Sequence, residues 1–293
     1  MISRKERIEK LYTLLNPCRL CPHACGIDRF ASAMGRCGSG KNILISSSNL
    51  HFGEEPPVSG FKGSGTIFFT NCNLSCVFCQ NYPISQLRNG NPATVGELAE
   101  KMLDLQKQGA HNINFVTPTH FAPQIVEAVY IARDAGLNIP LVYNCGGYEA
   151  VGTLELLEGI IDIYMPDAKY SDAGKSQKYS SAPNYWTVNK KALKEMHRQA
   201  GNLEVDDKGV ARKGLLIRHL VLPNDISGSS EVLEFIAKEL SPDTYVSIMS
   251  QYHPANKTDM FPELSRKVSA REYNRVVKLA ENLGLDKGWI QEL

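Results

Sequence analysis

The chain lacks the features that mark secreted, membrane-bound or nucleic-acid-binding proteins. Its 293 residues include 32 Lys and Arg and 31 Asp and Glu, a formal net charge of +1, and no block of one sign indicates a nucleic-acid or anionic-membrane partner. The opening segment MISRKERIEKLYTLL has the pattern of a charged amphipathic helix, and its apolar stretch is too short for a signal peptide or a membrane span. We therefore expect a cytoplasmic protein with no nucleic-acid and no membrane partner.

Cysteine is scarce over most of the chain but dense near its start. Seven of the eight cysteines lie in two groups before residue 80. In a reducing compartment such groups indicate metal ligation rather than a disulfide framework. Cys145 stands apart, and we interpret it as a half-buried, inert thiol.

The string CNLSCVFC carries Cys72, Cys76 and Cys79 directly after the strand-like run at residues 65–70. Three thiolates can hold three irons of a cubane 4Fe-4S cluster, and one iron stays open for a ligand because no fourth cysteine follows nearby. A closed zinc site needs four ligands, and Gln80 and Asn81 are poor ones. Zinc, buried inert thiols and an ordinary ferredoxin-type cluster are therefore the less favoured alternatives.

From residue 65 onward, short β-branched or apolar runs alternate with longer helical patterns, which predicts βα units and a parallel sheet. We expect strands at residues 66–70, 113–117, 141–143, 161–165, 215–222 and 245–249. We expect helices at residues 95–108, 123–135, 153–157, 185–199, 230–240 and 270–283, and a turn or hairpin at 206–213. The predicted fold class is α/β, an open, partial (βα)6 TIM-like barrel over residues 64–293, with a small cysteine-rich N-terminal extension at residues 1–63.

The cluster motif and several later strings together resemble one enzyme family. The cysteine spacing, with Phe78 just before Cys79, is similar to the signature of the radical S-adenosylmethionine (radical SAM) enzymes, in which the amino-acid end of S-adenosylmethionine occupies the open iron. With VYNCGGYE, IDIYMPDAKY, LLIRHLVLP and SQYHP in this order, the chain over about residues 50–290 resembles the pyruvate formate-lyase activating enzyme-like radical SAM proteins. It is most similar to a poorly characterised branch with CQNYPIS-like and NINFVTPTHF-like segments and an N-terminal cysteine-rich stretch.

The resemblance implies roles for individual residues besides the three cluster cysteines. Phe78 would lie near the adenine of S-adenosylmethionine, and the residues that match the cofactor-binding set are Asn144, Asp167, Lys169 and His253. The backbone carbonyl of Met165 and the Asp167 carboxylate match positions that hold a monovalent cation in relatives. The alternative for Asp167 and Lys169 is a surface ion pair worth at most ~1 kcal/mol.

The strand ends are where a barrel of this kind carries its chemistry. At one of them the chain departs from the family, because a Gly-Gly-Glu segment that binds the cofactor's amino group is replaced by TPTH, residues 117–120. We expect Thr119 or His120 to take over that contact, or the amine to be held otherwise. For His219, on an apolar strand, a hydrogen-bonded core histidine is at least as favoured as a ligand. Glu54 and Glu55 either face the barrel mouth or, in the commoner case, are solvated loop carboxylates.

The first cysteine group contains Cys18, Cys21, Cys25 and Cys37, a second set of four thiolates. This number suits either a tetrahedral zinc ion or a fully ligated iron-sulfur cluster, and reduced cysteines without metal are the alternative. A metal site with four protein ligands has no open position for a substrate. It would therefore stabilise the structure or transfer electrons rather than activate a substrate. His23 is a substitute ligand or, more simply, a bystander.

The resemblance implies a radical SAM oxidoreductase. A flavodoxin or ferredoxin would reduce the 4Fe-4S cluster, and S-adenosylmethionine would be cleaved to methionine and a 5′-deoxyadenosyl radical that removes hydrogen from a substrate. The favoured substrate is a glycine of a glycyl-radical enzyme, which would make the protein an activase. The alternatives are a radical SAM enzyme that modifies a small molecule or peptide, and a non-catalytic iron-sulfur or zinc scaffold.

Overall fold

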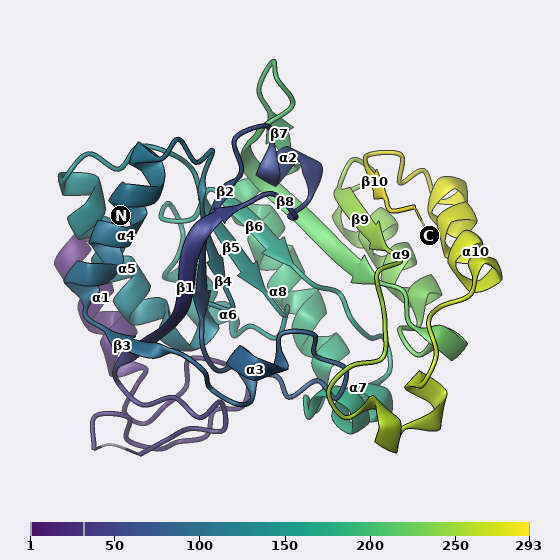
Figure 1. The fold of residues 1–293 in the computed structure, drawn as a ribbon, viewed down its shortest axis with the longest axis horizontal. Helices are drawn as coiled ribbons and strands as arrows, with labels where there is room; N and C mark the ends of the chain where they lie inside the picture. Colours follow the sequence, from purple (N-terminus) through teal and green to yellow (C-terminus); the bar gives the residue numbers. More distant parts are fainter. Residues whose placement is uncertain (1, 32, 293) are drawn as a thin grey trace.

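One mixed sheet of ten strands organises the chain in the computed structural model, which describes residues 2–31 and 33–292 (Figure 1). The strand order is β10-β9-β8-β6-β5-β4-β2-β1-β3, and β7 pairs with β8 off this path. The strands are β1 Ile43–His51, β2 Ser64–Phe69, β3 Asn91–Ala93, β4 Ile113–Val116, β5 Leu141–Cys145, β6 Ile163–Pro166, β7 Glu204–Val205, β8 Ala211–Leu220, β9 Tyr245–Met249 and β10 Gly288–Ile290. No helix within the two described ranges is long and apolar enough to cross a membrane.

Seven neighbouring strands, from β2 to β10, are all parallel. The predicted α/β class and the six predicted strands are thereby confirmed, with boundaries that differ by a few residues. The prediction missed β10, because a run of only three residues carries no period that distinguishes a strand. The sheet path ends at β10 on one side and at β3 on the other, so the barrel is open, as expected.

The helices lie around the sheet in Figure 1. They are α1 Arg4–Thr13, α2 Pro56–Ser59, α3 Tyr82–Ser85, α4 Val95–Lys107, α5 Ala122–Asp134, α6 Val151–Glu155, α7 Ala173–Ser180, α8 Tyr185–Ala200, α9 Ser229–Phe235 and α10 Ala270–Asn282. Both α4 and α10 begin at capping boxes, in which Thr94 pairs with Glu97 and Ser269 with Glu272. Each box satisfies backbone N–H groups that the first helical turn leaves free, which explains why these helices start there.

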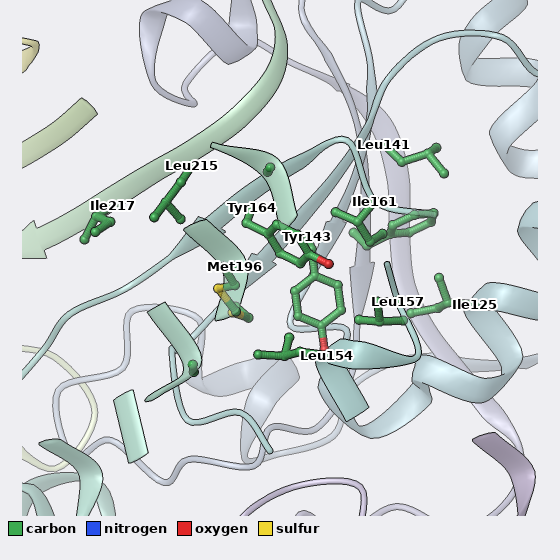
Figure 2. Close-up of a cluster of buried hydrophobic side chains, with 14 of the residues drawn as sticks. Ile125, Leu141, Tyr143, Leu154, Leu157, Ile161, Tyr164, Met196, Leu215 and Ile217 are labelled. Atoms are coloured by element: carbon green, nitrogen blue, oxygen red, sulfur yellow. The ribbon is translucent and has the colours of Figure 1, made fainter. Parts of the chain in front are cut away.

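A hydrophobic core fills the space between the sheet and the helices on its outer face (Figure 2). Leu141 and Tyr143 of β5 contribute to it, together with Ile125 of α5 and Met196 of α8. Because successive side chains of a strand point to opposite faces, the alternate residues of β5 face the barrel interior. This alternation decides which polar side chains can reach a site inside the barrel.

The N-terminal residues supply the edge and the floor of the barrel. β1 pairs antiparallel with β2, from Ile45 opposite Phe69 to His51 opposite Ser64, and β3 continues beyond it. Val58 of α2 is fully buried against a layer of interior side chains from β5, β6 and β8, namely Val142, Ile163 and Leu216. α2 therefore closes the barrel at its floor, the end opposite the carboxyl ends of the parallel strands. At the same end, β7 and β8 form the predicted hairpin.

Candidate functional site

The loop after β2 places Cys72, Cys76 and Cys79 around one cavity of about 340 Å³. Two donors point at the first two sulfurs: the Leu74 N–H lies 3.3 Å from Cys72 Sγ, and the Ser180 hydroxyl lies 3.0 Å from Cys76 Sγ. Such donors stabilise thiolates, which are the form that binds metal. The three cysteines therefore line the same cavity, where one cluster could bind all three.

The spacing of these thiols bears on the kind of group they fit. Within residues 2–31 and 33–292, no three His, Cys, Asp or Glu side chains converge tightly enough to hold a single metal ion. A cubane places each thiolate on a different iron, so its ligands stand farther apart than those of one ion. Burial raises the pKa of the Cys76 thiol to about 11, and bound iron would reverse that shift because it coordinates the thiolate. The donor set fits a 4Fe-4S cluster.

A row of buried charged and polar side chains lines the same cavity. Asp167 accepts from Lys169 Nζ at 2.5 Å and from Arg218 Nε at 2.9 Å, and Arg218 Nη2 donates to Asn144 Oδ1 at 2.7 Å. The three charged side chains are only 11 to 17% exposed. The alternative of a surface ion pair for Asp167 and Lys169 is therefore wrong.

The charges in this row stabilise one another. Burial alone would raise the pKa of Asp167, but the Arg218 guanidinium and the Lys169 ammonium outweigh burial and hold that pKa below its usual range. Burial would likewise lower the pKa of Lys169, and the Asp167 carboxylate raises it instead. Two cations thus face the cavity with one ionised carboxylate between them, so these three side chains together carry a net positive charge, and Glu54, 3.7 Å from Arg218, is a second carboxylate of the same lining.

Strand register explains why these residues meet. Asn144 of β5 lies opposite Met165 of β6, and the backbone of Asp167 pairs with that of Arg218. Asn144, Met165 and Arg218 each follow by two residues a member of the apolar layer over α2, so they form the next interior layer. The sequence prediction did not include Arg218 among the cofactor-binding residues, although a charge within the apolar run LLIRHL is a signal of an inward-facing polar residue.

Glu54 extends this polar region toward the floor of the barrel. Its Oε1 accepts from Asn114 Nδ2 at 3.0 Å and from Asn144 Nδ2 at 3.4 Å, and its Oε2 lies 3.7 Å from Arg218. Burial raises the pKa of both Glu54 and Glu55 against the opposing effect of Arg218. The interpretation of these two as solvated loop carboxylates is wrong. The sequence analysis missed Asn114, a polar residue in the buried strand INFV.

The segment that replaces Gly-Gly-Glu presents Thr117 to the cavity, not the two residues expected. Thr119 donates to the Glu149 carboxylate at 2.8 Å, and the His120 ring bonds the Thr70 carbonyl at 2.7 Å, both in buried surroundings. Thr117 has φ +58°, a left-handed conformation that is costly for a β-branched residue and is typical of functional sites. Neither Thr119 nor His120 lines the cavity.

Phe78, His253 and His219 lie outside the lining of the cavity. Phe78 is buried edge-on against Tyr170 and Tyr252. The exposed His253 lies beside the cluster loop, with its Nδ1 3.1 Å from Gln80 Nε2. His219 bonds the Ala168 carbonyl and the Ser229 hydroxyl, as expected of a core histidine.

Cys18, Cys21, Cys25 and Cys37 gather in the coil between α1 and β1, which lies along the same lower edge as α3 in Figure 1. The sulfurs of Cys25 and Cys37 lie 3.3 and 3.6 Å from the position that a Cβ on Gly35 would take. Cys145 is buried, whereas a half-buried thiol was expected. His23 bonds the Asn73 carbonyl at 2.8 Å, beside the cluster loop.

Comparison with known proteins gives a consistent picture. Residues 66–199 match the family model described as the radical SAM superfamily. The chain is 31% identical over 290 residues to an uncharacterized protein of Methanocaldococcus jannaschii, MJ0674, an alignment that covers 96% of this chain and 79% of that protein.

Solved structures share the fold at low sequence identity. The FeFe-hydrogenase maturase HydG from Carboxydothermus hydrogenoformans aligns with a TM-score of 0.52 at 12% identity, over 76% of this chain and 52% of that chain. SuiB of Streptococcus suis, bound to its precursor peptide SuiA, aligns with a TM-score of 0.51 at 13% identity, over 75% of this chain and 46% of that chain. The match thus spans about half the length of these solved chains.

Proposed function

Because the chain belongs to the radical SAM superfamily, we propose that it is an activase that abstracts hydrogen from a glycine of a partner glycyl-radical enzyme. The observation that carries the cofactor chemistry is the shared cavity, which brings Cys72, Cys76 and Cys79 to the buried row of Asp167, Lys169 and Arg218. A reduced 4Fe-4S cluster with S-adenosylmethionine supplies a 5′-deoxyadenosyl radical when both are bound.

The chain's own residues bind and orient the cofactor. Three thiolates hold three irons and leave one open. The net positive row, with Lys169 and Arg218 lining the cavity, suits the carboxylate of S-adenosylmethionine, and the Asp167 carboxylate suits its ammonium group. Burial of the row strengthens these contacts because water does not screen them. Each Asp167 oxygen already accepts a bond from Lys169 or Arg218 and keeps a second acceptor position, which either the ammonium group or a monovalent cation, proposed from the resemblance, would use.

Access to the cavity supports a peptide substrate. His51 and Gly53, at the end of β1, line the cavity together with Gln251, which follows β9. β1 and β9 lie near opposite ends of the open sheet, so the cavity is bordered from both sides of the barrel. An extended glycine-containing loop needs a lateral entrance of this kind.

One observation favours the small-molecule alternative. Asn114 Oδ1 and Glu55 Oε2 are buried acceptors without a hydrogen-bond partner, and both belong to side chains around Glu54 and Arg218. Buried acceptors without donors are costly, and a ligand can satisfy them. Neither Asn114 nor Glu55 lines the cavity itself, so a small molecule with amine, amide or hydroxyl donors would meet them only by reaching past Glu54, and a peptide held at the mouth would not.

The first experiment tests the cofactor chemistry. Anaerobically reconstituted protein with S-adenosylmethionine and a reductant should release 5′-deoxyadenosine, and Cys76→Ala should abolish the release and lower the iron and sulfide content. Cys145→Ala is the matched control: Cys145 lines the same cavity but lies outside the CNLSCVFC motif, so its loss should keep the iron and sulfide. Equal 5′-deoxyadenosine yields from Cys76→Ala and the parent would refute the cluster assignment.

The second experiment tests the substrate. The reduced protein and S-adenosylmethionine are mixed with the glycyl-radical enzymes of the host, and electron paramagnetic resonance is used to look for a glycine-centred doublet. The expected result is a doublet with one partner. If no partner gives a doublet while a metabolite extract stimulates 5′-deoxyadenosine release, the small-molecule function replaces the activase.

A further inference from the structure

The coil between α1 and β1 has too little apolar core to hold its shape alone. Among its described residues, Leu15 and Leu20 are the only apolar side chains besides Cys18 that are buried. Segments with so small a core are usually fixed by disulfides or by a metal, and the described part of this coil contains neither helix nor strand. Its four cysteines are all free thiols.

The four thiols are neighbours, although they come from both ends of the coil. The Gly26 N–H donates to the Cys18 carbonyl at 3.1 Å, which brings the adjacent Cys25 beside Cys18, and the Ala24 N–H donates to the Cys21 carbonyl at 3.0 Å. Gly35 has no side chain and sits against the sulfurs of Cys25 and Cys37. A larger residue at this position would occupy the space between the two.

Backbone hydrogen bonds form turns at these cysteines. The Cys18 N–H donates to the Ile27 carbonyl at 2.8 Å, and the Gly38 N–H, next to Cys37, donates to the Gly35 carbonyl at 2.8 Å. Each of the four cysteines therefore lies in or beside a hydrogen-bonded turn, which limits how far its thiol can move.

The same coil holds the loop that carries Cys72. Asn71 and Asn73, on either side of Cys72, are both buried. Asn71 Nδ2 donates to Ser39 Oγ at 2.9 Å, and the Asn73 carbonyl accepts from the His23 ring at 2.8 Å. The residues that flank the first cluster cysteine therefore bond directly to the coil.

We propose that Cys18, Cys21, Cys25 and Cys37 bind a second metal centre, and that its occupancy fixes the loop that carries Cys72 through Ser39 and His23. The shared chemistry is a thiophilic centre held by four thiolates. Four thiolates suit either an iron-sulfur cluster or a tetrahedral zinc ion, and these are the two arms of the test. This site is separate from the cavity and does not depend on the identity of the substrate.

The test uses the full chain and needs no activity measurement. Cys25→Ser and Cys37→Ser change cysteines that are not buried, so they should leave the barrel folded. We expect each to remove one metal centre per chain, seen as lost zinc or as lost iron with sulfide, while the Cys72 cluster stays. Hydrogen exchange of residues 71–79 should become about tenfold faster, because the coil no longer holds the loop. Arg19→Gln, an exposed change in the same coil, is the control and should alter neither readout.

Each outcome decides part of the proposal. Unchanged metal content in both serine variants overturns the second centre. Lost metal with unchanged exchange at residues 71–79 overturns the coupling to the loop. His23→Gln, which keeps a donor for the Asn73 carbonyl, should preserve slow exchange, whereas His23→Ala should accelerate it with the metal retained. Because none of these readouts uses S-adenosylmethionine, their failure is distinct from failure of the proposed enzyme function.

Discussion

The charged residues inside the barrel form ion pairs with one another, so the contribution of each to the free energy of unfolding depends on its partners. Removing one partner of a buried ion pair leaves an uncompensated charge and costs about 3–5 kcal/mol. Asp167 has two cationic partners, whereas Glu54 has, among the described residues, the more distant Arg218 and two amides. The ionised form of Glu54 is therefore less well compensated than that of Asp167.

Glu54→Gln should therefore change the pH dependence of stability. The pKa of Glu54 in the folded protein lies above its ordinary value of 4.5. At pH values between the pKa of the unfolded chain and that of the folded protein, Glu54 binds fewer protons in the unfolded chain than in the folded protein. Stability therefore falls as pH rises through this range. Relative to the parent, Glu54→Gln should gain thermal stability as pH rises from about 4.5 to neutrality.

Thermal unfolding of the parent and the variant across this pH range measures the difference. Glu281→Gln, on the exposed face of α10, should run parallel to the parent at every pH. A Glu54→Gln protein that instead loses stability as pH rises would mean that Arg218 stabilises the ionised carboxylate more than burial opposes it.

Individual residues differ in how far the sequence could predict them. The three cluster cysteines and Lys169 were predictable because local spacing and short strings carry them. The role of Glu54 was not, since its side chain reaches the interior only because β1 runs antiparallel to β2 and the following turn folds over the floor. Thr117 was likewise unpredictable as the lining residue, because its left-handed backbone sets which side chain of TPTH faces the cavity.

At the scale of elements, the junction after β5 depends on one close backbone approach. Gly147 has φ +73°, and a Cβ there would lie 2.0 Å from the Asp167 carbonyl oxygen. That carbonyl also accepts from Tyr185 Oη at 2.9 Å and from Asn189 Nδ2 at 3.0 Å. The glycine therefore lets the ends of β5 and β6 come together beside the cavity.

Gly147→Ala should destabilise the protein by at least about 2 kcal/mol, since it adds left-handed strain to a backbone clash. The melting temperature should fall by about 5 °C or more. Gly152→Ala is the matched control, because nothing lies within 4 Å of its Cβ position in α6, and alanine should be neutral or stabilise the helix by up to about 1 kcal/mol. Equal melting temperatures for the two variants would contradict the close approach.

Elements were predictable where the pattern was long and periodic. The apolar residues of α4 recur with a helical period, and β4 and β9 are short runs rich in β-branched residues. These patterns predicted the positions of all three elements within a few residues. α7 was missed because it carries no strong apolar stripe in AGKSQKYS. β3 was missed because it is a three-residue edge strand containing proline, which is stabilised only by its pairing with β1.

At the scale of the whole molecule, charge is balanced overall but not around the cysteine-rich coil. Asp28 is the only acidic residue between positions 14 and 42. Arg19, Arg36, Lys41 and Arg88 are exposed on or beside the coil. Exposed apolar side chains lie among them, with Phe30 at 45%, Met34 at 64% and Leu87 at 62% exposure. This face suits an acidic electron-transfer protein, such as a flavodoxin or ferredoxin, because its charge is complementary and its centre is apolar.

Arg36→Glu and Arg88→Glu should each slow reduction of the protein by an acidic flavodoxin about tenfold at low salt, because they reverse charge on the docking face. Added salt should lower the reduction rate of the parent and bring it closer to the rates of the two variants, since the Debye length falls to about 10 Å at 0.1 M. Anaerobic stopped-flow absorbance of the cluster measures the rate. Lys278→Glu, on α10 at the far side of the molecule in Figure 1, is the control and should reduce at the parent rate. If Arg36→Glu and Arg88→Glu are reduced as fast as the parent at low salt, the electron donor docks elsewhere. The coil would then serve only its proposed metal centre and the loop that carries Cys72.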